Sequence, residues 1–524
     1  MRLRNYKGSE LQEMKYKYLF TDFHTNIHHE QMSQLNEWYE QAKEMLDFWP
    51  IAYYPFYLRK DSKGIFLEDI HTDDKVQEDW KNICKFIDEK NNKDFPVFAG
   101  YEWQGAGLDG DHNVFFMDKG PLVAPMRYKE LYEELKETTA LAIPHHLAYS
   151  LSHRGKNWST HIDEFSPFAE IFSSHGSSES GDTDIHMTRH IHMGPRTGGT
   201  SVFDGLKMGH KVGIIASGDN HVVAAQYGHG FAGVLAEDNS PEKIWDALKS
   251  RRVYGMTSGR VKLLYEINEN VMGSEFSTKD NSLKHHVSVE TQDEIDRFVI
   301  YKNGRPHYTY NHSEKWIEDQ LEDIVTFKFK IEFGWGPDLK MYPDINTKIW
   351  NGKLNTSGKI KSIEKCWSSR GQSINQKDES SCEFELTTRK TTQSGKWMGP
   401  APVTTEGFVF EIEANRDSNI ILEIDGQVFE KSVSELLDNT SLIVFLDEAK
   451  ALAKERFDFD EYYRSDPFYH NAYKVRLLKA KPENAYKIDK EVNLDFEEDA
   501  FYLVKVYQTD GAVAWSSPIW IKNN

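Results

Sequence analysis

Short apolar runs alternate with longer polar or amphipathic segments as far as about Gly255, and this alternation constrains the fold more than any other feature of the chain. The runs are Tyr18–His24, Phe48–Tyr54, Phe95–Glu102, Ala140–His145, Phe168–Ser174, Val212–Ser217 and Phe231–Leu235. The segments between them include Gln31–Leu46, Asp74–Glu89, Tyr128–Glu137 and Pro241–Ser250. Continuous apolar runs separated by helix-length segments are typical of a parallel sheet with crossover helices. The pattern predicts an α/β fold with a β/α barrel in preference to an open sheet.

The pattern changes from about Val261 onward, where short segments of alternating polarity follow one another. They include LYEIN, HHVSVET, RFVIYKNG, FKFKIEF, GFVFEIEA and FYLVKVYQ, with turn residues such as Asn303-Gly304 and Asp425-Gly426 between them. This is an all-β pattern. We therefore predict a barrel over residues 1–258 and a β-rich, sandwich-like region over 259–524 that packs on it, with a helical insertion around Leu446–Arg456.

Charge and composition exclude several classes of partner. The net charge of −20 would repel a nucleic-acid backbone or an anionic membrane. No stretch approaches the length of an apolar membrane span. The three cysteines, Cys84, Cys366 and Cys382, suit a reducing compartment, although Cys366 and Cys382 could pair if two strands bring them together. We expect a cytoplasmic protein without a nucleic-acid or membrane partner; the sequence leaves its oligomeric state open.

Polar residues stand at the end of nearly every apolar run. They are His24, Tyr53 and Tyr54, Glu102, His145 and His146, His175, and finally Asp219 and His221. The active site of a β/α barrel is built at the carboxyl ends of its strands, so these residues are expected to converge. If Tyr18–Asn26 is one strand, Asp22, His24 and Asn26 project from the same face.

Histidine with carboxylate is a ligand set for zinc, manganese or iron. A single histidine is more often a structural residue. The set at the strand ends has no comparably simple structural explanation, and we predict one or two bound divalent metals.

The motifs TDFHTN, FAGYEW, AIPHH, EIFSSHGSSE and IIASGDNH together resemble the polymerase-and-histidinol-phosphatase (PHP) superfamily of metal-dependent phosphoesterases. RRVYGMTSGR and AVAWSSPIWI are similar to segments of the long bacterial PHP-like proteins that are classed as a domain of unknown function. The resemblance implies a distorted barrel of seven β/α units with metals at its mouth, where a metal-bound hydroxide attacks a phosphate ester. By position it implies the metal ligands His24, Glu102, His145, His175, Asp219 and His221.

The chain departs from the PHP motifs at two places. Asn26 stands where the family has a second histidine, and Tyr53-Tyr54 stands where it has Asp-His. The remaining ligands suffice for one or two metals. His28 or His29 could compensate, although a pair after a strand is more often solvated. The tyrosines have two readings that stay open: they fill space left by a lost metal, or, with His221, they act in catalysis, a phenol serving as acid or base.

Other polar residues are candidates for substrate contact. Arg154 and Asn157 follow His145 in a loop, where an arginine fork could clamp a phosphate, sulfate or carboxylate. His112 and His146 are further candidates. A solvated or structural side chain is the alternative for each of them.

Three functions follow from these features. The first is a metal-dependent hydrolase of a phosphate-type ester on a small organic or sugar substrate. The second is a metal-dependent enzyme that cleaves a sulfate ester or glycosidic bond with Tyr53 or Tyr54. The third is a degenerate barrel that binds a saccharide without turnover; the aromatic content of 13% fits carbohydrate surfaces and β-sandwich cores equally well.

Overall fold

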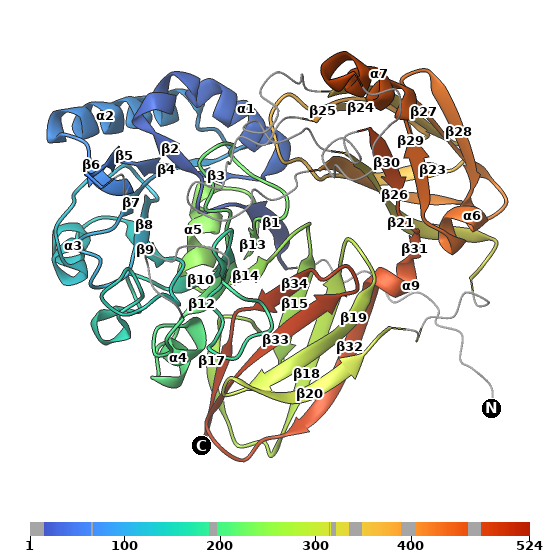
Figure 1. The fold of residues 1–524 in the computed structure, drawn as a ribbon. Coiled ribbons are helices and arrows are strands. Elements are labelled where there is room, and N and C mark those ends of the chain that lie inside the picture. Colours follow the sequence, from blue (N-terminus) through green and yellow to red (C-terminus); the bar gives the residue numbers. More distant parts are fainter. Residues whose placement is uncertain are drawn as a thin grey trace.

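Strands dominate the chain, and the longer helices lie mainly in its first half (Figure 1). The computed structural model describes residues 15–63, 66–187, 196–313, 315, 321–334, 348–388, 405–458 and 473–524. Its helices are η1 (His29–Gln34), α1 (Leu35–Met45), α2 (Asp73–Lys90), α3 (Tyr128–Leu135), η2 (Trp158–Thr160), α4 (Val202–Lys207), α5 (Pro241–Lys249), α6 (Val433–Asp438), α7 (Leu446–Phe457) and α9 (Glu483–Tyr486). The helical segments predicted from the sequence are confirmed as η1 with α1, α2, α3, α5 and α7.

The first half holds several short ladders of both directions. Parallel strands β2 (Asn26–His28), β4 (Ala52–Tyr54) and β7 (Val97–Trp103) are extended by antiparallel strands β8 (His112–Phe116) and β9 (Ala140–Pro144). Strand β3 (Trp49–Pro50) joins β7, and β10 (Phe168–Ser173) pairs parallel with β12 (Gly213–Ala216) and antiparallel with β11 (Gly176–Ser177). Strands β5 (Phe56–Lys60) and β6 (Phe66–Ile70) form a hairpin.

These ladders do not close into the barrel of seven parallel strands that we expected; among the described residues the first half is a mixed α/β structure with separate sheets. One cause is the connection from β7 to β8. The chain returns through residues 104–111 without a helix, and so short a connection permits only antiparallel pairing. Strand β1 (Lys17–Thr21) also pairs antiparallel, with β13 (Phe231–Ala236).

Tyr18–Asn26 is not one strand, so the condition for Asp22, His24 and Asn26 to project from the same strand face is not met. Strand β1 ends at Thr21 and β2 begins at Asn26. Between them the Asp22 carboxylate accepts hydrogen bonds from the main-chain N–H groups of His24 at 2.9 Å and Gly218 at 2.8 Å. Such local bonds compete with a β-ladder and turn the chain, so His24 leaves the sheet at its edge. A side chain at position 218 would collide with that carboxylate, which explains the glycine there.

The second half contains two groups of strands, both visible in Figure 1. The first comprises β15 (Lys262–Ile267), β16 (Asn270–Val271), β17 (Glu275–Thr278), β18 (Ser282–Glu290), β19 (Ile295–Lys302), β20 (Arg305–Asn311), β32 (Lys487–Asp495), β33 (Ala500–Gln508), β34 (Val513–Ser516) and β35 (Ile519–Asn523). The second comprises β21 (Ile324–Phe333), β22 (Lys348–Thr356), β23 (Lys359–Lys365), β24 (Ser373–Gln376), β25 (Ser381–Thr388), β26 (Glu406–Asn415), β27 (Asn419–Ile424), β28 (Gln427–Ser432), β29 (Ser441–Val444), β30 (Lys474–Leu477) and β31 (Lys481–Pro482).

The second group is a sandwich of two sheets. The six-stranded sheet around β26 and β21 faces the five-stranded sheet around β25 and β22. Their inner faces meet through aromatic rings: Phe333 lies 5.5 Å from Trp350, and Phe384 lies 5.2 Å from Phe408, measured between ring centroids. Alternating buried residues of two sheets that interdigitate in this way form the core of a sandwich.

One sheet runs through both predicted regions of the chain. Strand β14 (Val253–Met256) pairs with β13 on one side and with β34 on the other, where Tyr254 faces Ser516. The sheet then continues through β33 to β19 and β20. The main chain therefore hydrogen-bonds directly across the boundary that we predicted at residues 258 and 259.

An aromatic cluster lies directly beneath the strand ends. Phe23 is 2% exposed and its ring lies 6.0, 5.8 and 5.5 Å from those of Phe48, Phe115 and Phe168. Because Phe23 precedes His24, its burial fixes the backbone that carries this histidine. Within the described residues, no helix has the length and apolar character needed to cross a membrane.

Candidate metal centre

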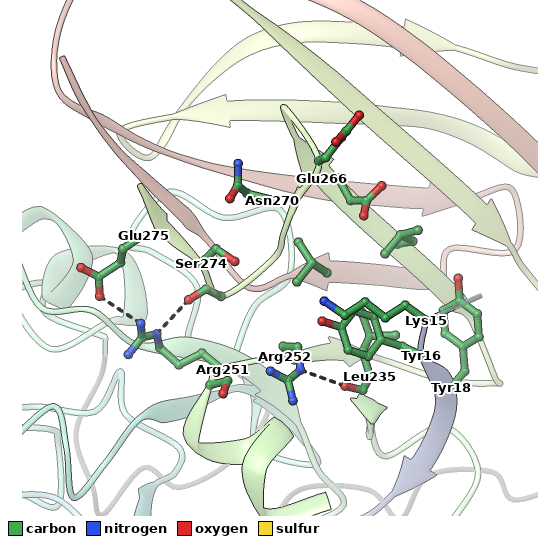
Figure 2. A pocket seen from close by; sticks show the side chains of 15 residues that line it. Lys15, Tyr16, Tyr18, Leu235, Arg251, Arg252, Glu266, Asn270, Ser274 and Glu275 are labelled. Carbon is green, nitrogen blue, oxygen red and sulfur yellow. Dashed lines mark hydrogen bonds and ion pairs between the residues drawn. The ribbon is translucent and has the colours of Figure 1, made fainter. Parts of the chain in front are cut away.

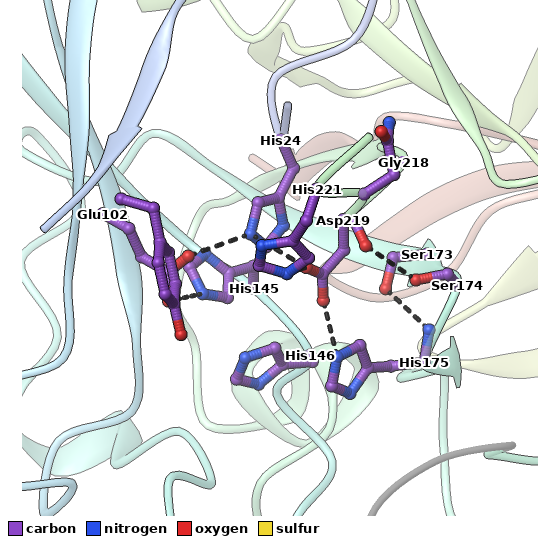
Figure 3. Close-up of polar contacts among 12 residues, drawn as sticks. His24, Glu102, His145, His146, Ser173, Ser174, His175, Gly218, Asp219 and His221 are labelled. Atoms are coloured by element: carbon purple, nitrogen blue, oxygen red, sulfur yellow. Dashed lines mark hydrogen bonds and ion pairs between the residues drawn. The ribbon is translucent and has the colours of Figure 1, made fainter. Parts of the chain in front are cut away.

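Polar side chains from five parts of the first half meet at one place (Figure 3). His24 follows β1, Glu102 lies in β7, and His145 and His146 follow β9. His175 follows β10, and Asp219 follows β12. The convergence at strand ends that the sequence predicts is therefore present in a sheet arrangement that differs from a closed parallel barrel.

The first group of possible ligands is His24, Glu102 and His145, whose ligand atoms lie within 4.8 Å of one another. Glu102 Oε2 lies 3.4 Å from His24 Nε2, and Glu102 Oε1 lies 3.7 Å from His145 Nε2. The two imidazole rings are 4.1 Å apart between centroids. All three side chains are buried, so the group is shielded from bulk water.

The second group is His146, His175 and Asp219. Asp219 Oδ2 lies 2.6 Å from His175 Nε2, and the His146 and His175 rings stack at 4.6 Å. Asp219 Oδ1 lies 3.4 Å from His24 Nε2, so this carboxylate joins the second group to the first. Figure 3 shows Glu102 and Asp219 on opposite sides of His24.

The sequence did not single out two further carboxylates as ligands. Asp111 forms a third group with His145 and His146, and its Oδ2 lies 3.4 Å from His146 Nε2. Glu170 Oε2 lies 3.0 Å from His24 Nδ1, and Glu170 Oε1 accepts the main-chain N–H of His146 at 3.1 Å. Glu170 is the one charged residue inside the apolar run Phe168–Ser174, and only this feature of the sequence could have marked it as a candidate ligand.

Electrostatics at the centre favour a bound cation. Burial raises the pKa of Asp22 to about 7 and that of Asp111 to about 8. Burial also disfavours the charged forms of Glu102 and Asp219, but neighbouring histidines hold the pKa of both carboxyls well below the usual range. Against its own burial, Asp219 and Glu170 hold the pKa of His24 well above its ordinary value. The charged forms of Glu102 and Asp219 are thus stabilised by positive charge between the ligands.

Several buried polar atoms at the centre also lack hydrogen-bond partners. They are Oδ2 of Asp22, Oδ1 of Asp111 and both ring nitrogens of His145. Leaving such atoms unsatisfied costs about 1–3 kcal/mol each. Imidazole and carboxylate are also the ligand types of zinc, manganese and iron sites. The residues present therefore fit a divalent metal.

His221 lies at the outer side of the centre, where it contacts His28. Its Nε2 is 3.7 Å from Asp219 Oδ1, and its Nδ1 is 2.7 Å from Nε2 of His28. His28 is half-buried, so its interpretation as a solvated residue is wrong. His29 instead meets Asp79 of α2, with 2.7 Å between Nδ1 and Oδ2. His28 therefore places a second imidazole beside His221 at the outer side of the centre.

The two tyrosines of β4 point in opposite directions, as successive residues on a strand do. The Tyr54 ring packs against His28 and His221, with centroids 4.6 and 5.1 Å away, and its hydroxyl donates to Glu68 at 2.9 Å. The Tyr53 hydroxyl donates to Asp79 Oδ2 at 2.7 Å in the interior. Tyr54 thus borders the centre, whereas Tyr53 is held at α2.

Arg154 reaches the centre through its carboxylates. Its guanidinium ion-pairs with Asp111, lies 2.9 Å from Glu68 Oε2 and approaches Glu102 Oε1 at 3.6 Å. The side chain is 18% exposed, so one side of it faces solvent. This arrangement puts a cationic fork beside the candidate ligands.

Of the other three predicted substrate contacts, His146 lies among the possible metal ligands, and His112 and Asn157 have structural partners. His112 is fully buried; its Nδ1 donates to the Gly110 carbonyl at 2.9 Å and its Nε2 lies 3.0 Å from Lys156 Nζ. Asn157 caps η2, where its side chain accepts the main-chain N–H of Ser159 at 3.1 Å. Satisfied structural contacts therefore account for both residues.

A hollow of about 540 Å³ lies elsewhere, beside β15–β17 and the chain before β1 (Figure 2). Its arginines already have partners: Arg251 pairs with Glu275 at 2.9 Å, and Arg252 donates to the Leu235 carbonyl at 3.2 Å. None of the predicted site residues lines it. The hollow therefore has no part in the candidate centre.

Comparison with known proteins gives partial matches. Residues 173–288 match a family model described as a protein of unknown function, DUF3604. An uncharacterized protein of Chlamydia pneumoniae is 24% identical over 273 residues, which are 47% of this chain and 43% of the relative. One of Chlamydia muridarum is 22% identical over 274 residues, with the same shares. The chain thus matches less than half the length of these relatives.

A solved two-domain protein of Bacteroides vulgatus, described as containing a predicted PHP-like metal-dependent phosphoesterase, aligns with 82% of this chain and 99% of its own. The identity is 12% and the TM-score is 0.31.

Proposed function

We propose that this protein is a metal-dependent hydrolase of phosphate-type esters carried by a small organic or sugar molecule. The observation that carries the proposal is the set of three overlapping His/Asp/Glu groups around His145 and His146, all buried. A buried carboxylate and imidazole cluster with unsatisfied atoms is costly unless a cation binds there. The order of the sequence motifs, which resembles the PHP superfamily, points to phosphoester chemistry.

The two main groups each supply two imidazoles and one carboxylate. His24, Glu102 and His145 would hold one cation, and His146, His175 and Asp219 a second. When bound, such metals lower the pKa of water and stabilise charge on a phosphoryl group. Glu170 fixes the ring of His24 through Nδ1, which leaves Nε2 directed at Glu102 and Asp219.

The exposed side of the centre is where a substrate would enter. Exposure rises from 1–2% at His145 and Glu102 to 18% at Arg154, 30% at Glu68 and 36% at His221. An arginine fork on this side pairs two of its N–H groups with the oxygens of a phosphate. Arg154 would therefore orient the ester, with His221 and Tyr54 along the same border.

Tyr54 supports a second candidate, the cleavage of a sulfate ester or glycosidic bond with a phenol as proton donor. Its ring lies against His221, and its hydroxyl lies between Glu68 and Gln104. Burial and the Glu68 carboxylate hold the pKa of Tyr54 well above its ordinary value, so the phenol keeps its proton. This leaves Tyr54 a possible proton donor and disfavours it as a base. Phosphoester hydrolysis ranks first because the ligand groups and the order of the sequence motifs support it.

Elemental analysis of protein purified without added metal, together with a screen of phosphate, sulfate and glycoside esters, tests the proposal. We expect phosphate-ester hydrolysis and a loss of one to two metal equivalents in His145→Ala relative to wild type. If the metal content of wild type and His145→Ala differs by less than about 0.2 equivalents, both proposed metal-dependent enzyme functions are contradicted. Turnover of sulfate esters or glycosides alone would favour cleavage with Tyr54 as proton donor. Saccharide binding without turnover would favour a non-catalytic, saccharide-binding protein.

A further inference from the structure

A second cluster of metal-binding side chains lies outside the centre described above. Ligand atoms of His161, Asp163 and His210 lie within 4.8 Å of one another. Asp163 Oδ1 is 2.9 Å from Nδ1 of His210 and 3.5 Å from Nε2 of His161. Ligands at about 2.0–2.1 Å from a tetrahedral metal are separated by roughly 3.4 Å, which these two distances bracket.

The burial of His161 is a second reason to expect a metal ion at this cluster. Its side chain is 0% exposed, and neither ring nitrogen has a hydrogen-bond partner of normal geometry. Nε2 faces Asp163, so a buried lone pair points into the cluster. A metal ion would satisfy it.

The nearby lysine does not exclude a cation. Lys156 is buried over the rings of Tyr128 and Trp158, at 4.4 and 5.8 Å from their centroids. Burial lowers the pKa of Lys156 to about 7, so much of its charge is absent at neutral pH. Asp163 and His210 are 38% and 23% exposed, which gives water a path to a remaining coordination position.

The cluster is held by elements that come before two neighbouring strands. His161 and Asp163 precede β10, and His210 precedes β12, while Glu170, His175 and Asp219 of the first centre lie within or after these strands. The main-chain N–H of Lys211 donates to Asp163 Oδ2 at 3.0 Å. Trp158 packs on the His161 and His210 rings at 4.9 and 5.4 Å. The two clusters thus occupy opposite ends of the β10–β12 pair.

We propose that His161, Asp163 and His210 form a site for a divalent transition metal, with zinc as the fitting ion and water as its fourth ligand. Two imidazoles and one carboxylate are a common zinc set. The metal would tie the segment before β10 to the segment before β12. Such a site needs no substrate and is independent of the proposed hydrolase activity.

Zinc titration of the full-length, chelator-stripped protein tests this site. His210→Gln and Asp163→Asn change partly exposed side chains, so the fold should survive. His153→Gln, in an exposed position of the same connection, is the matched control. We expect both site variants to bind about one zinc equivalent fewer than wild type and the control, with the first centre still loaded.

A second measurement removes any dependence on the first centre. In a His145→Ala/Asp219→Asn background, which removes a ligand from each group of the first centre, zinc should still raise the thermal midpoint because it binds only the folded state. Adding Asp163→Asn should remove most of that rise. Equal zinc content in wild type, His210→Gln and Asp163→Asn would overturn the proposal. So would a zinc-induced rise of the same size with and without Asp163. Loss of ester hydrolysis in His145→Ala alone concerns only the first centre.

Discussion

Asp219 lies between two histidines that belong to different ligand groups: its Oδ1 is 3.4 Å from His24 Nε2 and its Oδ2 is 2.6 Å from His175 Nε2. Its backbone is left-handed, with φ of 48°, in the turn that follows β12. One carboxylate thus connects the two parts of the candidate metal centre.

Asp219→Asn should therefore weaken metal binding by both groups at once. We expect a larger fall in affinity than the ~10- to 100-fold that follows loss of an outer-shell partner, because a direct ligand is removed. Competition with a chromophoric chelator measures this. Asp246→Asn, an exposed aspartate of α5 that is 59% accessible, is the matched control. Wild-type affinity in Asp219→Asn would contradict the proposed centre.

Glu170→Gln tests the orienting contact to His24. The amide keeps the size of the side chain but removes the charge that lies 3.0 Å from His24 Nδ1. We expect a ~10- to 100-fold loss of metal affinity and a matching loss of hydrolysis at low metal, rescued when metal is raised. Activity that stays low at saturating metal would instead mean that Glu170 acts in the reaction itself.

Tyr54→Phe separates the two catalytic readings. Under phosphoester chemistry its effect on kcat should be mild, whereas loss of a proton donor would cost on the order of 10² or more. Tyr53→Phe is the companion variant. It removes the hydrogen bond to buried Asp79 and should lower the free energy of unfolding by about 1–3 kcal/mol without changing kcat.

The ion pairs of His286 should make the stability of the β region depend on pH. It lies 3.1 Å from Glu266 and 2.8 Å from Asp489, and these contacts raise its pKa to about 9. The pKa in the folded state exceeds the unfolded value of about 6.5, so the stabilisation is full below pH 6.5 and is lost as pH rises through about 9. We expect about 1 kcal/mol, since Asp489 is 72% exposed and screened.

The thermal midpoints of wild type and His286→Gln at pH 6, 8 and 10 check this. The difference between the two proteins should be largest at pH 6 and small at pH 10. A difference that is constant over this range would show that the imidazolium pairs contribute nothing.

The sequence predicted which residues meet better than it predicted how the strands are joined. His24, Glu102, His145, His175 and Asp219 come together because each follows or ends an apolar run, and that relation survives whether neighbouring strands are parallel or antiparallel. The antiparallel pairing of β8 with β7 could not be predicted from the apolar runs. A segment such as HNVFF has the same pattern of apolar residues whether its strand pairs parallel or antiparallel.

The missed carboxylates have a physical explanation. Asp111 reaches His146 only because β8 and β9 pair, with His112 opposite Pro144. No local sequence pattern reveals the register in which two strands pair. Glu170 was visible as one charge in an apolar run, yet a lone charge on a strand more often faces solvent. The directions of Tyr53 and Tyr54, in contrast, followed from strand alternation alone once β4 was known.

The pairing of Tyr254 with Ser516 has a consequence for how the protein is made. Strand β14 keeps one edge open until β34 has been synthesised, and unpaired strand edges invite association with other chains. Contacts so distant in sequence also form slowly. The half that carries the candidate metal centre therefore cannot complete its sheet while the ribosome is still translating the β region.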